Sequence, residues 1–256
     1  MPPIYPELNL NILMEMAWSG MTRNRRSFRQ DALHLSTDLP LKVQGIENIP
    51  LTGPALIVMN HYHRPGFQAF WISLAISAVV PAEIHWTMTG AWTNDGTPGA
   101  WLRALLSPHI LPRLARLYGF TSMPPMPPRP FETAAGAASV RHLLGAARQK
   151  PAPILGLAPE GQDNPTGGLM RPHPGVGRLL ALIAGMGYLF IPVGVVEDDR
   201  HLWLNFGSGF HLTIPAGLPP DELDHTAADQ VMHSIARLLP GELRGIYPNL
   251  GIAASR

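Results

Sequence analysis

Short apolar runs alternate along the chain with longer segments in which apolar residues recur every three or four positions. Compact apolar runs predict strands, and a recurrence near 3.6 residues predicts helices. The predicted strands are 41–44, 55–59, 84–88, 152–161 (running into a loop), 188–196, and a β pair formed by 201–207 and 210–215. The predicted helices are 6–21, 67–80, pieces of 98–118 that end at Pro108 and Pro112, 131–150, 175–186, and 221–240 with an aspartate cap.

This order of elements favours an α/β fold with a mostly parallel central sheet flanked by helices, because strands separated by helices of roughly 10 to 15 residues are typical of such sheets. A chain of 256 residues can bury a full core. We expect residues 31–256 to form one domain, preceded by an amphipathic helix within residues 1–30. Five prolines within 124–130 predict an extended surface segment of that domain, because proline prevents helix formation.

The composition of the chain excludes some classes of function and favours others. Hydrophobic residues make up 46% of the chain and charged residues only 14%, against roughly 25% charged residues in average soluble domains. With a mean hydropathy of +0.06, we expect contact with apolar material. A net charge of +1 argues against a nucleic-acid partner. The absence of cysteine excludes disulfides, thiolate metal sites and a cysteine nucleophile.

Two segments bear on membrane contact. Residues 179–196 approach the length of a membrane span, but Gly185, Gly187 and Pro192 predict a buried helix, turn and strand instead. The N-terminus lacks the pattern of a secretory signal. An apolar helix carrying Trp18 precedes a group of arginines, which fits either an interfacial anchor on anionic lipid or a helix that covers the domain's own core. We expect a cytoplasmic protein that associates peripherally with a membrane. The arginines of that group are Arg23, Arg25, Arg26 and Arg29.

Two loops that follow apolar strands carry the candidate chemistry. One is Asn60-His61-Tyr62-His63-Arg64, and the other is Pro159-Glu160-Gly161-Gln162-Asp163. In open α/β sheets, ligands bind beyond the carboxyl ends of the strands. We therefore expect both loops to line one crevice, where an imidazole, a carboxylate and a guanidinium are available for acid–base chemistry.

At these loops the sequence resembles the glycerolipid acyltransferase superfamily, the lysophospholipid and 1-acylglycerol-3-phosphate acyltransferases. "LKVQGIENIPLTGPALIVMNH" is similar to the approach to that family's first motif, and "LAPEGQDNPTGGLMRPHPGVGRLLA" to its third. "FIPVGV" is similar to the fourth, and "RLYGFTSMPPMPPR" matches the second more weakly. The resemblance runs in order over roughly residues 41 to 196.

The resemblance implies acyl transfer from a thioester, either acyl-CoA or acyl carrier protein, to a hydroxyl group of a glycerolipid. It implies that His61 is the general base. A histidine of ordinary pKa, ~6.5, can accept a proton near pH 7, and such a base contributes about 10²–10⁴-fold in rate. Pro159, Glu160 and Gly161 match the motif associated with binding the acceptor, and Asn60 is expected to fix the loop and to contribute to substrate binding. The donor is a substrate, and no resident cofactor or metal is expected.

The first motif departs from the family pattern. Five positions after its histidine the family has an aspartate that orients the imidazole, and here that residue is Gly66. Loss of the equivalent carboxylate in a serine-protease triad costs about 10⁴ in turnover. Either Glu160 or Asp163 replaces the aspartate, or activity is weak or absent. His63 is a candidate to share the catalytic role.

The third motif departs as well. A Thr-Arg pair associated with the acceptor's phosphate is replaced by Gln162-Asp163, and like charges repel by ~4 kcal/mol at 4 Å for an effective dielectric constant of 20. The acceptor's phosphate is therefore bound by other cations, or the acceptor has no phosphate near this loop. The candidate cations are Arg64, Arg129 and Arg171.

Two other function classes remain open. A lipid-binding protein that kept the crevice but lost turnover would bind lipid without forming a product. A hydrolase with a metal at His61, His63 and Glu160 would require a stoichiometric metal ion. No G-x-S-x-G motif is present, so a serine hydrolase is unsupported.

Overall fold

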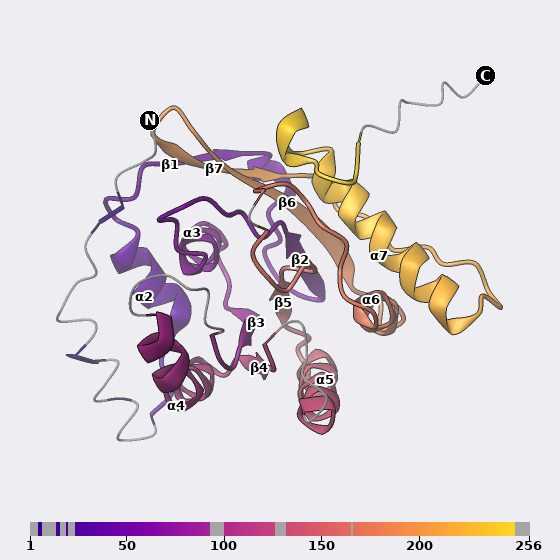
Figure 1. Cartoon of the computed structure of the whole chain (residues 1–256), viewed down its shortest axis with the longest axis horizontal. Helices are drawn as coiled ribbons and strands as arrows, with labels where there is room; N and C mark the ends of the chain where they lie inside the picture. Colours follow the sequence, from indigo (N-terminus) through magenta and orange to yellow (C-terminus); the bar gives the residue numbers. More distant parts are fainter. Residues whose placement is uncertain are drawn as a thin grey trace.

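The protein has a central β-sheet with helices on both sides (Figure 1). The computed structural model describes residues 5–6, 14–15, 19, 24–92, 100–125, 132–164 and 166–248. Within these residues seven strands form the sheet, in the order β1-β7-β6-β2-β5-β3-β4. Their bounds are β1 (Leu41–Gln44), β2 (Ala55–Met59), β3 (Ile84–Thr89), β4 (Thr121–Met123), β5 (Ile154–Leu157), β6 (Leu189–Asp198) and β7 (His201–Phe206). Only β6 and β7 pair in antiparallel fashion among these strands. The predicted α/β class with a mostly parallel sheet is confirmed.

Helices cover both faces of the sheet. The described helices are α2 (Phe28–Leu35), α3 (Phe70–Val79), α4 (Ala100–Tyr118), α5 (Thr133–Ala147), α6 (Val176–Ala184) and α7 (Pro220–Ala236), with short 3-10 turns η1 (Ile46–Asn48) and η3 (Gly241–Leu243). Helices α2, α3 and α4 lie on one face, and α5, α6 and α7 lie on the other (Figure 1).

The central strand β2 shows why its sequence is apolar throughout. Ala55, Ile57 and Met59 point into the core beneath α2, α3 and α4. Leu56 and Val58 point into the core beneath α5, α6 and α7. Because both faces of a parallel sheet are buried, successive side chains on either face must be apolar. This places β2 at the centre of the sheet, and the loop that follows it at the carboxyl edge.

The prediction of helical pieces that end at Pro108 and Pro112 was wrong, because α4 is continuous through both prolines. A proline leaves the carbonyl oxygen four residues earlier without its usual N–H donor. For Pro108 that carbonyl belongs to Ala104, and the buried Ser107 hydroxyl donates to it at 3.3 Å. The same hydroxyl accepts the backbone N–H of Trp92 at 2.8 Å. A neighbouring side chain therefore replaces the missing donor.

Two further sequence predictions were wrong. Residues 210–215 do not pair with β7, which instead lies between β1 and β6; Phe210 forms only an isolated bridge with Phe190. Helix α7 begins at Pro220 after the N-cap residue Pro219 and has no side-chain cap. Proline suits the first helical position because its missing N–H would be unpaired there in any case.

The segments considered for membrane contact have different outcomes. Residues 179–196 form the predicted helix, turn and strand, as α6 and β6. Among the residues that the structure describes, no helix has the length and apolar character needed to cross a bilayer. The helix predicted at 6–21 lies outside the described residues, except for isolated positions. The domain boundary at residue 30 stays a prediction; α2 runs across that position.

Candidate functional site

The two predicted loops meet at one edge of the sheet. Strands β2 and β5 are parallel neighbours, so the residues that follow Met59 and Leu157 emerge side by side. The backbone N–H of His61 donates to Oε1 of Glu160 at 2.8 Å. This hydrogen bond joins the loop after β2 to the loop after β5, as the position of the two loops predicts.

Asn60 fixes the start of the first loop. Its side-chain amide donates to the carbonyl oxygen of Val195 at 2.9 Å and accepts the N–H of the same residue at 2.7 Å. The side chain is buried, and both of its polar atoms are engaged with β6. The structure therefore gives Asn60 a position-fixing contact, and its predicted contact with substrate remains untested.

Glu160 is a buried carboxylate that crosslinks three segments. Only 1% of the residue is exposed. Oε1 accepts from His61, and Oε2 accepts the N–H of Met170 at 2.9 Å. Burial raises the pKa of Glu160, and these two N–H donors oppose that rise. The carboxylate thus holds the backbone of His61 in place and does not contact its imidazole.

The residues on either side of Glu160 shape the turn. Pro159 is buried, and the N–H of Gly161 donates to the carbonyl oxygen of Ala158 at 3.1 Å. Gly161 has φ +69°, a conformation that glycine adopts without steric cost. Pro-Glu-Gly is therefore a tight turn that directs the glutamate inward, beneath the first loop.

Asp163 lies against the imidazole of His61. Nδ1 of His61 is 2.8 Å from Oδ1 of Asp163, and Nδ1 of His63 is 3.6 Å from Oδ2. The His61 contact is short, but Nδ1 is buried without an aligned hydrogen bond; such bonds are often poorly aligned before substrate binds. The side chains of His61 and Asp163 are 23% and 52% exposed. One half-exposed carboxylate therefore faces two imidazoles.

Gly66 has a structural reason to be glycine. The N–H of Phe67 donates to the carbonyl oxygen of Arg64 at 3.0 Å, which closes a turn with Pro65 and Gly66 at its centre. Gly66 has φ +81°, and a positive φ after proline is typical of a type II turn. The position at which the related family has its aspartate is thus an exposed turn residue here.

Arg64 is engaged within the protein. Its Nη2 donates to Oε1 of Glu197 at 2.8 Å, and its Nε contacts the other carboxylate oxygen. The hydroxyl groups of Tyr62 and Tyr5 also donate to Glu197. Burial raises the pKa of Tyr62. The Arg64–Glu197 ion pair anchors the first loop to the end of β6. The sequence prediction missed Glu197, although it directly follows the apolar strand predicted at 188–196.

The other two predicted cations are Arg171 and Arg129. Arg171 is exposed, follows Met170, and lowers the pKa of Tyr247 against the rise caused by burial. Arg129 lies outside the described residues. The structure therefore brings together His61, His63, Glu160 and Asp163, whereas contacts of Arg64, Arg129 and Arg171 with substrate remain predictions.

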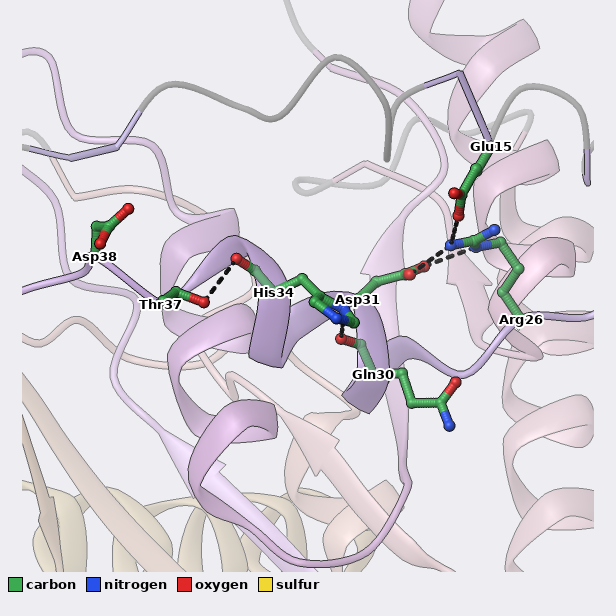
Figure 2. Close-up of a pocket in the computed structure, with 7 residues that line it drawn as sticks. All are labelled: Glu15, Arg26, Gln30, Asp31, His34, Thr37 and Asp38. Carbon is green, nitrogen blue, oxygen red and sulfur yellow. Dashed lines mark hydrogen bonds and ion pairs between the residues drawn. The ribbon is translucent and has the colours of Figure 1, made fainter.

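A separate hollow of about 560 Å³ lies beside α2, where Figure 2 shows Arg26 between Glu15 and Asp31. Arg26 donates to both carboxylate oxygens of Asp31 at 2.6 and 2.8 Å, and the Tyr118 hydroxyl donates to the same carboxylate at 2.8 Å. These contacts satisfy a buried charge and tie α2 to α4. The hollow has no residue from either candidate loop. It is lined by Glu15, Arg26, Gln30, Asp31, His34, Thr37 and Asp38.

Within the described residues, no group of three or more His, Asp or Glu side chains is arranged to hold a metal ion. The geometry of His61, His63 and Glu160 thus lends no support to the metal-dependent hydrolase. The arrangement instead presents an imidazole whose Nδ1 faces a carboxylate and whose ring is partly exposed. A partly exposed imidazole paired in this way can accept a proton from a bound hydroxyl group.

Comparison with known proteins adds three findings. A family model described as Acyltransferase matches residues 40–196. No curated protein matches the chain. Among matching solved structures is the 1-acyl-sn-glycerophosphate (LPA) acyltransferase PlsC from Thermotoga maritima, with 15% identity, a TM-score of 0.47, and coverage of 82% of this chain and 78% of that one.

Proposed function

Because the chain belongs to the acyltransferase family, we propose that it transfers a fatty acyl group from a thioester to a hydroxyl group of a lysophospholipid, a glycerolipid or a related alcohol. The donor is acyl-CoA or acyl carrier protein. Both candidate loops lie inside the matched residues. The observation that carries the proposal is the 2.8 Å contact between His61 Nδ1 and the Asp163 carboxylate, at an edge where Glu160 holds the His61 backbone.

In this reaction His61 acts as the general base. Since Nδ1 faces Asp163, Nε2 takes the proton of the acceptor hydroxyl as its oxygen attacks the thioester carbonyl carbon. A new C–O bond forms, the C–S bond breaks, and the departing thiolate takes the proton back from Nε2. The products are an ester and a free thiol. A base positioned in this way contributes about 10²–10⁴-fold in rate.

Asp163 replaces the carboxylate that is missing at Gly66. The two departures from the family pattern compensate for each other: the first loop loses an acid at Gly66, and the third motif gains one at Asp163, where the pattern has arginine. A carboxylate beside Nδ1 favours the imidazolium that forms when His61 takes a proton. His63 contacts the same carboxylate and helps to fix its orientation.

The same carboxylate restricts the acceptor. A phosphate group close to Asp163 would be repelled by ~4 kcal/mol at 4 Å for an effective dielectric constant of 20. Arg64 is already paired with Glu197. We therefore expect acceptors whose reacting hydroxyl is not next to a phosphate monoester, such as neutral glycerolipids and lysophospholipids with a distant phosphodiester.

A panel of acceptors tests this function. Purified protein is supplied with labelled acyl-CoA or labelled acyl carrier protein, together with a lysophosphatidate, a lysophosphatidylcholine, a monoacylglycerol or a long-chain alcohol. We expect a labelled ester with at least one donor, and less product from the lysophosphatidate than from the neutral acceptors. Absence of an ester with every pair of donor and acceptor would refute the proposal.

A non-catalytic lipid-binding protein is the second candidate, and the glycine at position 66 favours it. It predicts that the acceptors bind while no ester forms. Acceptor binding, followed by intrinsic tryptophan fluorescence in the same samples, separates the two functions. Binding without transfer would support the second candidate.

A further inference from the structure

Helix α4 carries a row of exposed apolar side chains. Trp101, Leu105 and Ile110 are 63%, 60% and 51% exposed, and Leu102 and Leu106 are exposed between them. Trp101 and Leu105 lie four positions apart on the helix, and so do the successive residues Leu102, Leu106 and Ile110. Because residues four apart stack along a helix, the five form a strip of two adjacent rows on its exposed side. Single exposed apolar residues are normal on a protein surface, whereas a contiguous apolar patch marks an interaction site.

The charges on α4 are all of one sign. Residues 100–118 contain Arg103, Arg113 and Arg116 and no aspartate or glutamate. The guanidinium groups of Arg113 and Arg116 donate to carbonyl oxygens of α4 itself, at 3.0 and 3.3 Å, and so keep their positive charge beside the strip. Trp, Leu and Ile combined with arginines are typical of a helix that lies in the interface of an anionic bilayer.

The strip begins at the edge of the sheet that carries the candidate site. Strand β3 is parallel to β5, so the chain leaves β3 at the edge where His61 and Glu160 lie, and α4 starts from that edge. Four of the five apolar residues of the strip belong to the first half of α4, and Ile110 lies just beyond its middle. Trp92 joins them, because it is 49% exposed and its backbone N–H binds Ser107 of α4.

We propose that the α4 face, formed by this strip with Trp92, Arg113 and Arg116, binds the surface of an anionic lipid bilayer. Bound in this way, it seats the edge of the sheet that carries His61 at the level of the lipid headgroups. The inference rests on the exposed surface alone and does not depend on the proposed reaction. It differs from an anchor in residues 1–30, where Arg26 is paired with Asp31 and Arg29 donates to Val80.

The test is co-sedimentation of the full chain with vesicles of phosphatidylcholine, with or without phosphatidylglycerol. We expect binding that requires phosphatidylglycerol and weakens at about 1 M salt. The double variant Trp101→Ala/Leu105→Ala is expected to lose at least about tenfold in partitioning. Arg113→Gln and Arg116→Gln are each expected to lose roughly fivefold. Leu182→Ala is the matched control, because Leu182 is 52% exposed on α6, on the opposite face.

The following results of these measurements would overturn the inference. The first is no binding of the wild type to either kind of vesicle. The second is equal binding of the wild type and the apolar double variant. The third is a double variant that changes from oligomer to monomer on gel filtration without losing vesicle binding, which would make the α4 face a contact between protein copies.

A second assay separates this inference from the proposed function. Acyl transfer is measured with a short-chain lysophospholipid below its critical micelle concentration, so that no lipid surface is needed. Loss of vesicle binding with this transfer unchanged supports docking through α4. Loss of vesicle binding by Leu182→Ala to the same extent would overturn it, because the effect would then not be specific to α4.

Discussion

Replacement of Asp163 by asparagine tests whether this carboxylate supports His61. The substitution keeps the shape of the side chain and removes its charge. At the 2.8 Å that separates Nδ1 from Oδ1, 332/(ε·r) gives about 6 kcal/mol for an effective dielectric constant of 20 and about 1.5 kcal/mol for 80. Because the carboxylate is 52% exposed, the lower part of that range applies. We expect a loss of about 1.5–3 kcal/mol, or roughly 10- to 100-fold in kcat.

The assay is steady-state acyl transfer, with kcat and KM measured separately across pH. Asp163→Asn should lower kcat and leave KM nearly unchanged, since the carboxylate acts on a charge that develops in the transition state. Asp38→Asn, at an exposed aspartate away from the candidate loops, is the control.

Restoring the family motif provides a rescue. A Cβ at Gly66 would meet only Arg64 Nη1, at 3.6 Å, and aspartate tolerates a positive φ better than most residues. Gly66→Asp in the Asp163→Asn background should therefore recover part of the lost kcat. A kcat for Asp163→Asn within twofold of the wild type would refute the role of Asp163.

Three stability predictions follow from buried groups and close packing. Burial raises the pKa of Glu160, so the folded protein keeps the carboxyl proton to higher pH than the unfolded chain. The free energy of unfolding of the wild type, compared with that of Glu160→Gln by urea unfolding, should therefore be lower at about pH 8 than at about pH 5. Burial lowers the pKa of His85 to about 4, so the free energy of unfolding should fall as the pH drops from about 6.5 toward 4, by at most about 2–3 kcal/mol after allowance for partial exposure. A His85→Gln variant that loses as much stability over the same pH range would contradict this prediction. A Cβ at Gly177 would lie 1.8 Å from the carbonyl oxygen of Asp224, so Gly177→Ala should lower the free energy of unfolding by at least about 2–3 kcal/mol in thermal or urea unfolding. The control is Gly145→Ala, in α5 with open space around it, which should be neutral or slightly stabilising. Equal effects of the two substitutions would rule out the clash.

The parts of the fold that follow from local pattern were predictable. The strands at 41–44 and 55–59 have the predicted bounds, because an apolar run flanked by polar residues marks a buried strand directly. The meeting of the His61 and Glu160 loops was also predictable, since parallel neighbouring strands end at the same edge.

The other features of the fold and of the site depend on contacts between residues that are distant in the sequence. The continuity of α4 relies on a hydroxyl group of Ser107 that replaces a missing N–H. The position of β7 between β1 and β6 depends on which edges remain available when the sheet forms. The Glu197 carboxylate binds Arg64, 133 residues away. Sequence alone made Asp163 one of two possible partners for His61, and only the relative position of two loops distinguishes it from Glu160.

The most direct test of the central claim is the initial rate of ester formation by the wild type and by His61→Ala, with the acceptor that gives most product. His225→Ala, at an exposed histidine on α7, is the control. We predict that His61→Ala loses at least about 10²-fold in rate, while acceptor binding and unfolding midpoint stay at the wild-type level and His225→Ala stays fully active. Ester formation at the wild-type rate by His61→Ala would contradict the assignment of His61 as the base.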